Sequence, residues 1–320
     1  MGAGAIGTYF GDLLAAAGNE IVYAPRNLAD VQAAPADLAI IAVKSYDTDG
    51  AIQTLESALG AHSGTPILCP QNGVGNEEKL ASAFGADAVV ACAVTIPVER
   101  DTHGHGHAAN DGGIAVAPVG KEAHNWILAA FGQAGLRTKA FEDYRAMKWS
   151  KLALNIVANA SCAILNVLPE RLVHFDDVFR LEIHAIREVH AVMHAQGIGS
   201  IDLPRYPVRA LQAVAALPSP AARFLLAKRV AGARGTKPPS LLLDLRASKN
   251  VTEVGVLNGA VADAGRAHGV STPVNAVFSR VLSDIAHMPA LWAKYREQPH
   301  ALVAEYRAER DRMRRVRSWA

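Results

Sequence analysis

Met1-Gly2-Ala-Gly4-Ala-Ile-Gly7-Thr-Tyr-Phe-Gly-Asp-Leu-Leu-Ala-Ala-Ala-Gly18 is the stretch that decides the fold of this chain. Three glycines in the spacing GxGxxG are followed by an Ala- and Leu-rich run that closes on a glycine, which predicts a tight turn leading into a helix. In a dinucleotide-binding unit such glycines let the backbone approach the pyrophosphate, which lies at the positive end of the helix. The turn therefore predicts a cofactor-binding segment made of Gly2, Gly4, Ala5, Ile6 and Gly7.

The next segment, Glu20-Ile-Val-Tyr-Ala-Pro-Arg26, predicts a short strand with a basic residue at its end. The residue at that position meets the adenosine ribose, where an acid favours NAD and an arginine can pair with the 2′-phosphate of NADP. Arg26 therefore predicts NADP. An apolar strand normally precedes the first glycine, so the first strand of the sheet is expected either upstream of Gly2 or to be missing from the fold.

Further apolar runs predict a mostly parallel sheet with helices between its strands. Strands are expected over 37–44, 66–70, 87–98 and 137–141, with Ile114–Pro118 as the second arm of a hairpin, and helices over 47–59, 77–84 and 122–135. Lys44 and Asn72 follow the first two of these strands. Because the carboxyl ends of parallel strands face the ligand crevice, both side chains are expected beside a cofactor or substrate. The alternatives are a solvated loop lysine and a simple Asn-Gly turn.

From Asp143 onward the strand patterns disappear. Helices are expected over 145–166, 169–197, 205–217, 219–230, 240–247, 252–269, 272–287 and 298–315. The predicted fold class is therefore α/β, with a Rossmann-type dinucleotide-binding domain over 1–142 followed by an all-α domain over 143–320.

The first of these helices carries polar residues at every fourth position of an apolar run: Lys151, Asn155 and Asn159. On a helix this spacing places the three side chains in one stripe, and a helix that is apolar nearly all round is buried. A buried ammonium and two buried amides need partners, which a fixed internal network or a polar ligand could supply. At the start of the second domain the stripe is expected to face the cleft between the domains.

Composition and charge exclude several classes of function. Half of the residues are hydrophobic, 19% are charged and the net charge is +2, which gives no footprint for nucleic acid or an acidic membrane surface. No apolar run is long enough to span a bilayer, the chain opens on glycines rather than on a secretory leader, and a cytoplasmic location is expected. The cysteines Cys69, Cys92 and Cys162 are expected as buried free thiols.

Histidines 103, 105 and 107 alternate with glycine or alanine neighbours in Thr102-His-Gly-His-Gly-His-Ala108. The alternation suggests a metal ligand set, but no carboxylate or cysteine completes a familiar spacing, and no metal is expected there. Two later residues are further candidates. Ser240 stands near the start of a helix, where a hydroxyl commonly caps, and Glu253 stands in what resembles the first turn of another, where a carboxylate gains from the helix dipole.

Taken in order, these pieces resemble the ketopantoate reductase (2-dehydropantoate 2-reductase) family over nearly the whole chain. The motifs that carry the resemblance are Gly2-Ala-Gly4-Ala-Ile-Gly7, Arg26, Ala42-Val-Lys44, Gln71-Asn72-Gly73-Val-Gly-Asn-Glu-Glu78, Lys151-Leu-Ala-Leu-Asn155 with Asn159, Ser240, and Glu253 with Asn258-Gly259. The resemblance implies NADPH-dependent reduction of 2-dehydropantoate, or a similar 2-keto acid, to the hydroxy acid.

The resemblance also assigns roles to single residues. It implies that Lys151 is the catalytic lysine and Glu253 its acidic partner, and that Lys44 and Asn72 lie beside the NADPH. Arg26 would hold the 2′-phosphate. The residues implied to bind the substrate are Asn72, Asn155, Asn159 and Ser240. The expected partners are the small keto acid and, in a homodimer, a second copy of the chain, with no nucleic acid and no membrane.

Three departures from the family pattern leave alternatives open. The strand before Gly2 is not in the chain, the interval from Arg26 to Asp37 is shorter than the family pattern, and the interval from Asp244 to Glu253 is one residue longer than that pattern. The first two concern cofactor affinity, and the third concerns substrate choice. The alternatives are a reductase of a different 2-keto acid within the family and a degenerate member that binds a nucleotide without turnover.

Overall fold

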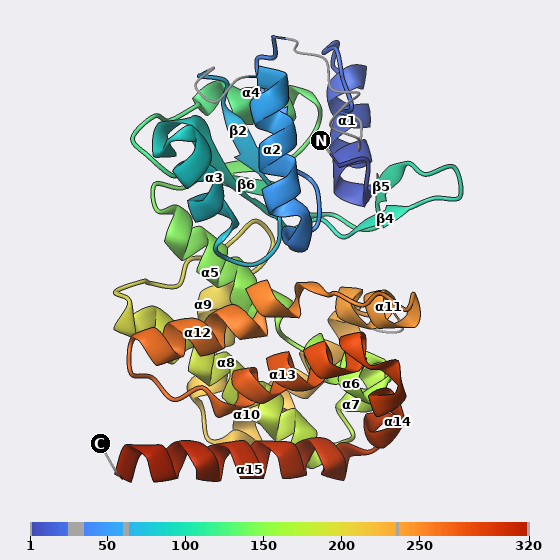
Figure 1. Cartoon of the computed structure of the whole chain (residues 1–320), viewed down its shortest axis with the longest axis vertical. Coiled ribbons are helices and arrows are strands. Elements are labelled where there is room, and N and C mark those ends of the chain that lie inside the picture. The colour runs from blue at the N-terminus through green and yellow to red at the C-terminus, as the bar shows by residue number, and fades with distance from the viewer. Residues whose placement is uncertain (1, 25–34, 60–63, 235–236, 319–320) are drawn as a thin grey trace. The chain divides into compact units, whose positions relative to one another are not determined.

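The computed structural model describes residues 2–24, 35–59, 64–234 and 237–318 of the chain. They form two compact units (Figure 1). The first holds residues up to Lys151 together with Ile201–Pro207, and the second holds Leu152–Ser200 and the residues from Val208 onward. The division therefore falls inside a helix, whereas the sequence-based boundary at 142–143 lies before that helix begins.

The first unit is built on a five-stranded sheet in the order β1-β2-β3-β6-β7. Strands β1 (Ala39–Ile40), β2 (Ile67–Cys69) and β3 (Val89–Val94) are parallel, β6 (Ile114–Pro118) is antiparallel to β3, and β7 (Thr138–Ala140) is parallel to β6. The hairpin relation of β3 and β6 and the edge position of β7 agree with the sequence patterns. The two remaining strands, β4 (Val98–Arg100) and β5 (Gly106–Ala108), form a separate small hairpin.

Helices cover both faces of this sheet, as the alternation of buried side chains along β3 requires. Phe10 and Leu14 of α1 (Ala5–Ala16) and Phe131 of α4 (Asn125–Gln133) pack on the face that carries Val90 and Cys92. Leu55 of α2 (Thr48–Leu59) and Leu80 of α3 (Asn76–Phe84) pack on the opposite face. Two short 3-10 turns, Ser45–Asp47 and Ala86–Ala88, complete the unit.

The prediction of a strand over residues 20–26 is wrong for residues 20–24, the part of this segment that the structure describes. Residues 20–24 belong to no strand, although Ile21 packs on the α1 face of the core. A strand needs hydrogen bonds to a neighbour, and β1, at the edge of the sheet, is paired in the described chain only with β2. Arg26, the residue predicted to choose NADP, lies outside the described residues.

The second unit is helical in every regular element of its described part, so the predicted order of an α/β part and an all-α part is confirmed. It begins in the last turn of α5 (Tyr144–Asn155). Its other helices are α6 (Ala160–Leu165), α7 (Pro169–Leu172), α8 (Asp176–Ala195), α9 (Val208–Ala216), α10 (Ser219–Arg234), α11 (Ser240–Arg246), α12 (Asn258–Ala267), α13 (Pro273–His287), α14 (Trp292–Tyr295) and α15 (Pro299–Ser318). The 3-10 turns are Glu253–Val256 and Pro289–Leu291. No helix of the described chain has both the length and the apolar character needed to cross a membrane.

Three helices that the apolar periodicity predicts as continuous are interrupted. Residues 145–166 divide into α5 and α6, residues 169–197 into α7 and α8, and residues 252–269 into a 3-10 turn and α12. At the first of these breaks periodicity gives no signal, because Ile156 and Ala160 on its two sides are both apolar and buried. The break between α5 and α6 falls within the predicted polar stripe.

Helix α13 is central to the second unit, because it packs against α6, α8, α12 and α15. Its first turn is capped by a buried carboxylate from α8. The backbone N–H groups of Val274 and Asn275 each donate to a Glu188 oxygen at 2.9 Å, and the Asn275 side chain donates to Glu188 Oε2 at 2.7 Å. Burial raises the pKa of the Glu188 carboxyl to about 7, against the lowering effect of these hydrogen bonds.

This raised pKa predicts a pH-dependent contribution to stability. A carboxyl whose pKa rises from 4.5 when unfolded to about 7 when folded stabilises the fold below pH 4.5 and loses that contribution as the pH rises through 7. The loss amounts to roughly 3 kcal/mol, since each pKa unit corresponds to about 1.4 kcal/mol. We therefore expect the destabilisation caused by Glu188→Gln, relative to the unchanged chain, to be largest at pH 5 and to shrink by about that amount at pH 8.

Urea unfolding at both pH values measures this difference, with Glu170→Gln, an exposed change in α7, as the control. The comparison has to be between variant and unchanged chain, because burial also lowers the pKa of His190 to about 4, which has the opposite effect over part of this range. A destabilisation by Glu188→Gln that is the same at pH 5 and pH 8 would contradict the raised pKa.

Candidate functional site

The glycine turn packs against the end of the first strand segment. Gly2 has a φ of +85°, and a Cβ there would lie 2.6 Å from the carbonyl carbon of Ala42. A Cβ at Gly7 would overlap the carbonyl oxygen of Gly2, so both positions need glycine for close backbone packing. At Gly4, by contrast, a Cβ would meet nothing within 4 Å. The outer surface of the turn is therefore open at Gly4.

The helix that follows this turn has an amino end suited to an anion. Gly4 is the N-cap of α1, no side chain caps the helix, and no acidic residue stands in its first turn. The Thr8 hydroxyl is directed to the Gly4 carbonyl at 2.9 Å and does not cap. The first N–H groups of the helix and the positive end of its dipole are thus left for solvent or for a bound anionic group.

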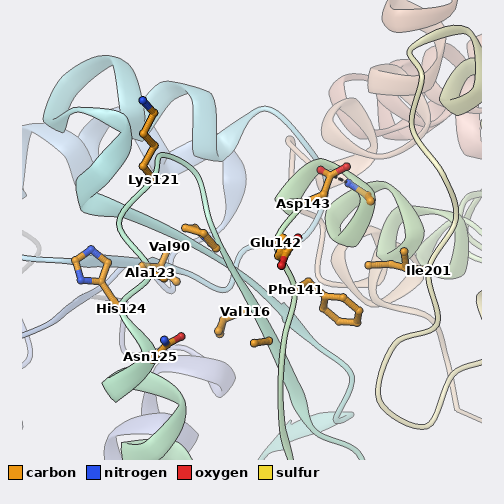
Figure 2. A pocket seen from close by; sticks show the side chains of 13 residues that line it. Val90, Val116, Lys121, Ala123, His124, Asn125, Phe141, Glu142, Asp143 and Ile201 are labelled. Atoms are coloured by element: carbon orange, nitrogen blue, oxygen red, sulfur yellow. Dashed lines mark hydrogen bonds between the residues drawn. The ribbon is translucent and has the colours of Figure 1, made fainter.

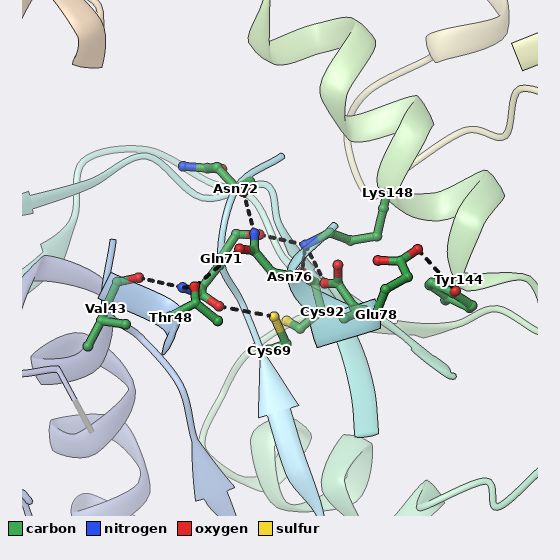
Figure 3. Close-up of polar contacts among 11 residues, drawn as sticks. Val43, Thr48, Cys69, Gln71, Asn72, Asn76, Glu78, Cys92, Tyr144 and Lys148 are labelled. Carbon is green, nitrogen blue, oxygen red and sulfur yellow. Dashed lines mark hydrogen bonds and ion pairs between the residues drawn. The ribbon is translucent and has the colours of Figure 1, made fainter. Parts of the chain in front are cut away.

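The loop after β2 meets the end of β1 through a ring of buried polar groups (Figure 3). The Gln71 amide donates to the Val43 carbonyl at 3.0 Å and to the Thr48 hydroxyl at 2.9 Å. The Thr48 hydroxyl lies 3.2 Å from Asn76 Oδ1, and Asn76 Nδ2 donates to the carbonyl of Asn72 at 3.1 Å. Because Gln71 and Asn72 are consecutive, these hydrogen bonds form a closed ring. The ring fixes the loop after β1 and the loop after β2 at the carboxyl edge of the parallel strands.

Lys44 and Asn72 therefore stand on two adjoining fixed loops, as their positions after successive strands predict. The Lys44 side chain is half-buried and that of Asn72 is exposed. Both make polar interactions within the protein. The glycine turn reaches the same loop from the other side, since Gly2 packs on Ala42 and Val43. The structure thus brings Gly2, Lys44 and Asn72 to one edge of the sheet.

A second lysine, which the sequence patterns did not single out, lies beneath this edge. The Lys148 ammonium of α5 is 3% exposed and pairs at 2.8 Å with the Glu77 carboxylate of α3, which is 1% exposed. It also donates to the carbonyls of Gln71 at 2.5 Å and Cys92 at 3.4 Å. Burial, the largest single effect, lowers the pKa of Lys148, but the charge and hydrogen bonding of Glu77 together with the neighbouring Cys69 and Cys92 outweigh it, so the pKa is raised and the ammonium stays charged.

Lys151, the predicted catalytic lysine, is half-buried one turn further along α5. Helix α5 starts where it does because the Asp143 side chain accepts a hydrogen bond from the Ala146 N–H at 3.0 Å, a typical N-cap contact. The Lys151 ammonium lies 6.0 Å from the centre of the Tyr206 ring, within the range of a cation–π contact. Lys151 also makes further polar interactions within the chain.

The predicted single stripe of Lys151, Asn155 and Asn159 on one helix is wrong, because the helix ends at Asn155. Ala158 has a φ of +50°, and its N–H donates to a buried carboxylate oxygen of Glu182 at 2.6 Å instead of continuing the helix. A carboxylate buried beside the chain takes the backbone donor that the helix would otherwise use. Asn159 is the residue before α6 and donates through its amide to the carbonyl of Asn155 at 3.0 Å.

Asn159 also links this break to the predicted serine. Its Oδ1 accepts a hydrogen bond from the backbone N–H of Leu241 at 3.2 Å, at the start of α11. Ser240 is exposed and is the first residue of that helix, whose N-cap is Pro239 without a side-chain cap. The alternative that Ser240 is a helix cap is therefore wrong. Within the second unit, the structure brings Asn155, Asn159 and Ser240 together.

The predicted acidic partner, Glu253, is 4% exposed and begins a 3-10 turn rather than a helix. The Thr252 hydroxyl accepts from the Val254 N–H at 3.4 Å and holds the start of that turn. The family motif continues with Asn258, a fully buried residue whose amide donates to Asn275 at 2.9 Å. Asn258 is therefore tied to α13 and its Glu188 cap.

The alternating histidines lie on the small β4–β5 hairpin. His105 pairs with Asp12 of α1 at 2.9 Å, and that hydrogen bond raises the pKa of the histidine. No group of three side chains able to hold a metal ion occurs in the part of the chain that the structure describes. Cys69, Cys92 and Cys162 are buried free thiols, as expected, and burial raises the pKa of Cys92 to about 12.

A cavity of about 770 Å³ in the first unit lies elsewhere (Figure 2). Val90 stands at the beginning of β3 and Pro118 at the end of the antiparallel β6, so the cavity opens at the amino ends of the parallel strands. None of the predicted site residues is among those that line it. In open α/β sheets ligands bind at the carboxyl ends, and the candidate site is therefore the edge that carries the glycine turn.

The fold and this edge define a class of protein. An α/β unit places a glycine turn, an uncapped helix start and two polar loops at the carboxyl edge of its parallel strands, as dinucleotide-binding enzymes do, and an all-helical unit follows it. The family models of ketopantoate reductase PanE/ApbA and of its C-terminal domain match residues 18–121 and 143–286. The chain belongs to the ketopantoate reductase family.

Individual relatives agree with this assignment. The chain is 30% identical over 247 residues to the 2-dehydropantoate 2-reductase of Salmonella typhi, covering 76% of this chain and 72% of that protein. The crystal structure of a PanE/ApbA family ketopantoate reductase from Ralstonia eutropha JMP134 is 27% identical with a TM-score of 0.73, covering 89% of this chain and 97% of that one. D-mandelate dehydrogenase with NADH and anilino(oxo)acetate shares the fold, at 18% identity, a TM-score of 0.73, and coverage of 89% of this chain and 96% of that one.

The packing of the turn predicts different costs for two of its glycines. Gly2→Ala forces a side chain into left-handed backbone and against Ala42, and we expect a loss of about 2–4 kcal/mol of unfolding free energy. Gly4→Ala enters open space, so its cost should stay within about 1 kcal/mol, the range of a changed N-cap. Urea unfolding of both variants measures the contrast, and equal costs would contradict the close packing of Gly2 on Ala42.

Proposed function

We propose that this chain catalyses the NADPH-dependent reduction of 2-dehydropantoate to pantoate. The observation that carries the proposal is the meeting of three predicted cofactor segments at one sheet edge: the glycine turn, the loop with Lys44 and the loop with Asn72. Membership of the ketopantoate reductase family supports the choice of reaction. The names of the curated relatives support the choice of substrate.

The residues of this edge fit the pyrophosphate of a dinucleotide. Open space at Gly4 leaves room for a phosphate at the amino end of α1, where N–H groups and the helix dipole favour negative charge. Lys44 is proposed to add a positive charge on the neighbouring loop. Arg26 is proposed to pair with the 2′-phosphate, which distinguishes NADPH from NADH. When bound, the reduced nicotinamide supplies the hydride that the reaction needs.

Lys151 is proposed as the general acid. Arrival of a hydride at the ketone carbon leaves negative charge on the oxygen, and an ammonium within hydrogen-bond reach stabilises that charge and can donate the proton that completes the hydroxyl group. Lys151 suits the task because its side chain is only half-buried and because its backbone belongs to a helix held firmly by Lys148. The cation–π contact with the Tyr206 ring limits the conformations of the Lys151 side chain.

The remaining roles rest on the family motifs, residue by residue. Asn72, Asn155, Asn159 and Ser240 are proposed to bind the substrate, and Glu253 is proposed as the acidic partner. The structure supports a common role for Asn155, Asn159 and Ser240, since hydrogen bonds of Asn159 place all three in one region of the second unit. Asn159 uses one amide hydrogen and its oxygen for this purpose, and its second amide hydrogen is proposed to bind the substrate.

Replacement of Lys151 tests the proposed chemistry. In Lys151→Ala we expect kcat for 2-dehydropantoate reduction to fall by about 10²–10⁴-fold, because the alkoxide loses its charge partner and its proton donor. The assay follows NADPH absorbance, and Lys121→Ala, an exposed lysine of the same unit, should keep full activity. Near-complete activity in Lys151→Ala would show that another group protonates the substrate.

Replacement of Arg26 tests the cofactor. Arg26→Ala should raise KM for NADPH by about 10–100-fold, the worth of a charge-assisted hydrogen bond, and change KM for NADH little. An equal effect on both cofactors would place Arg26 away from the 2′-phosphate.

A panel of 2-keto acids tests the substrate. The specificity kcat/KM should be highest for 2-dehydropantoate, and the aromatic benzoylformate should be a poor substrate. A preference for another keto acid would keep the reaction type and change the substrate, and an inactive protein that binds no NADPH would contradict the proposed function.

A further inference from the structure

The buried ion pair of Lys148 and Glu77 has a place in the fold that stability alone does not explain. Each of its two side chains is almost completely removed from water. Taking two charges out of water costs about as much free energy as their attraction returns, so such a pair is weak evidence of a stabilising role. What the pair does provide is a fixed geometry, because the ammonium is held on three sides by acceptors at set distances.

The three acceptors come from three different elements of the first unit. They are the Glu77 carboxylate on α3 at 2.8 Å, the Gln71 carbonyl in the loop after β2 at 2.5 Å and the Cys92 carbonyl in β3 at 3.4 Å. The two carbonyls accept hydrogen bonds from the ammonium (Figure 3), and the carboxylate lies at ion-pair distance from it. Lys148 thereby ties α5 to a helix, a strand and the loop after β2.

The contact to Gln71 passes this constraint on to the proposed cofactor edge. The carbonyl of Gln71 is bound by Lys148, while its side chain holds the Val43 carbonyl and the Thr48 hydroxyl. Through Asn76 the same ring holds the carbonyl of Asn72. One buried charge therefore determines the backbone position of both loops that carry Lys44 and Asn72.

The same charge also determines where α5 stands. Lys148 precedes Lys151 by three residues, so the two side chains project from neighbouring turns of one side of the helix. When Lys148 is fixed against Gln71, the backbone that carries Lys151 is fixed relative to the backbone that carries Asn72. Catalysis depends on such distances, because a misplacement of about 1 Å can lower a rate by about 10²-fold.

We propose that Lys148 and Glu77 are positioning residues for the reductase: their ion pair locks the Gln71–Asn72 loop to α5 and so sets the distance between the cofactor edge and Lys151. This proposal rests on the proposed function. Lys148 and Glu77 are assigned no contact with cofactor or substrate.

The test separates positioning from folding by removing one charge or both. Lys148→Met leaves the Glu77 carboxylate buried without a partner, and we expect a lower unfolding midpoint together with lost activity. The double variant Lys148→Met/Glu77→Met removes both charges and fills the same space with apolar groups. Its unfolding midpoint should return close to that of the unchanged chain, because an apolar pair can replace a buried ion pair without loss.

In the double variant we nevertheless expect kcat to stay lowered by about 10²-fold and KM for NADPH to be raised. Amide hydrogen exchange of residues 71–76, measured without ligand, should be at least about 10-fold faster, because the Gln71 carbonyl has lost the hydrogen bond from Lys148. A double variant with restored stability, unchanged kcat and unchanged exchange would overturn the proposal. The matched control is Lys79→Gln/Asp49→Asn, which removes an exposed 2.9 Å ion pair between α3 and α2 and should change none of these quantities.

A single change in the same ring tests the second half of the argument. Gln71→Met keeps the carbonyl that Lys148 binds and removes the amide that holds Val43 and Thr48. It should raise KM for NADPH more than it lowers kcat, whereas the double variant should affect both. If Gln71→Met lowered kcat as much as the double variant does, the carbonyl and the side-chain amide of Gln71 would not have the separate roles proposed for them.

The exchange measurement keeps this proposal separate from the proposed function. If the unchanged chain reduces no keto acid, the proposed function fails, and faster exchange of residues 71–76 in the double variant still decides whether the ion pair holds the loop. If the unchanged chain is active and the double variant matches it in rate and exchange, the function stands and the positioning role is wrong.

Discussion

A charged ammonium buried in a protein has to be surrounded by acceptors, and the ammonium of Lys148 finds them at the carboxyl edge of the sheet. The rest of the first unit's candidate site depends on this contact. The Gln71 carbonyl that it binds fixes a loop, and the Gln71 side chain fixes the next loop toward the glycine turn. The consequence is a rigid edge, and rigid support is what a binding site needs to hold a ligand in one geometry.

Buried carboxylates have a comparable effect in the second unit. Glu182 takes the N–H of Ala158 and ends a helix early, while Glu188 takes the first N–H groups of α13 and starts one. Both use a carboxylate oxygen where a backbone donor has no helical partner. The early end of α5 is what frees the Asn159 amide to contact Asn155 and Leu241, so the local geometry of the proposed substrate residues depends on Glu182.

Much of this arrangement could be predicted from the sequence, and the parts that could not have physical reasons. Lys44 and Asn72 follow buried strands, and a strand's end fixes the edge on which its next residue stands. The helix break at Ala158 could not be predicted, because it depends on Glu182, more than twenty residues away in the sequence. Lys148 also escaped prediction: among the polar residues of α5 it is off the four-residue spacing. Two of its three acceptors are backbone carbonyls, which leave no mark in a sequence, and the third, the Glu77 carboxylate, is distant along the chain. The strand expected over 20–26 is the opposite case, in which the sequence pattern is present but the strand is not. A strand forms only where a neighbouring strand accepts and donates its hydrogen bonds.

The most direct test of this account is amide hydrogen exchange of the whole chain with and without saturating NADPH. The account places the cofactor at the carboxyl edge of the parallel strands, so exchange should slow in residues 2–8, 43–46 and 71–76. It should not change around the cavity near residues 118–125, at the opposite edge. Slower exchange at residues 118–125 with none at the glycine turn, or no change anywhere at saturating NADPH, would contradict the account.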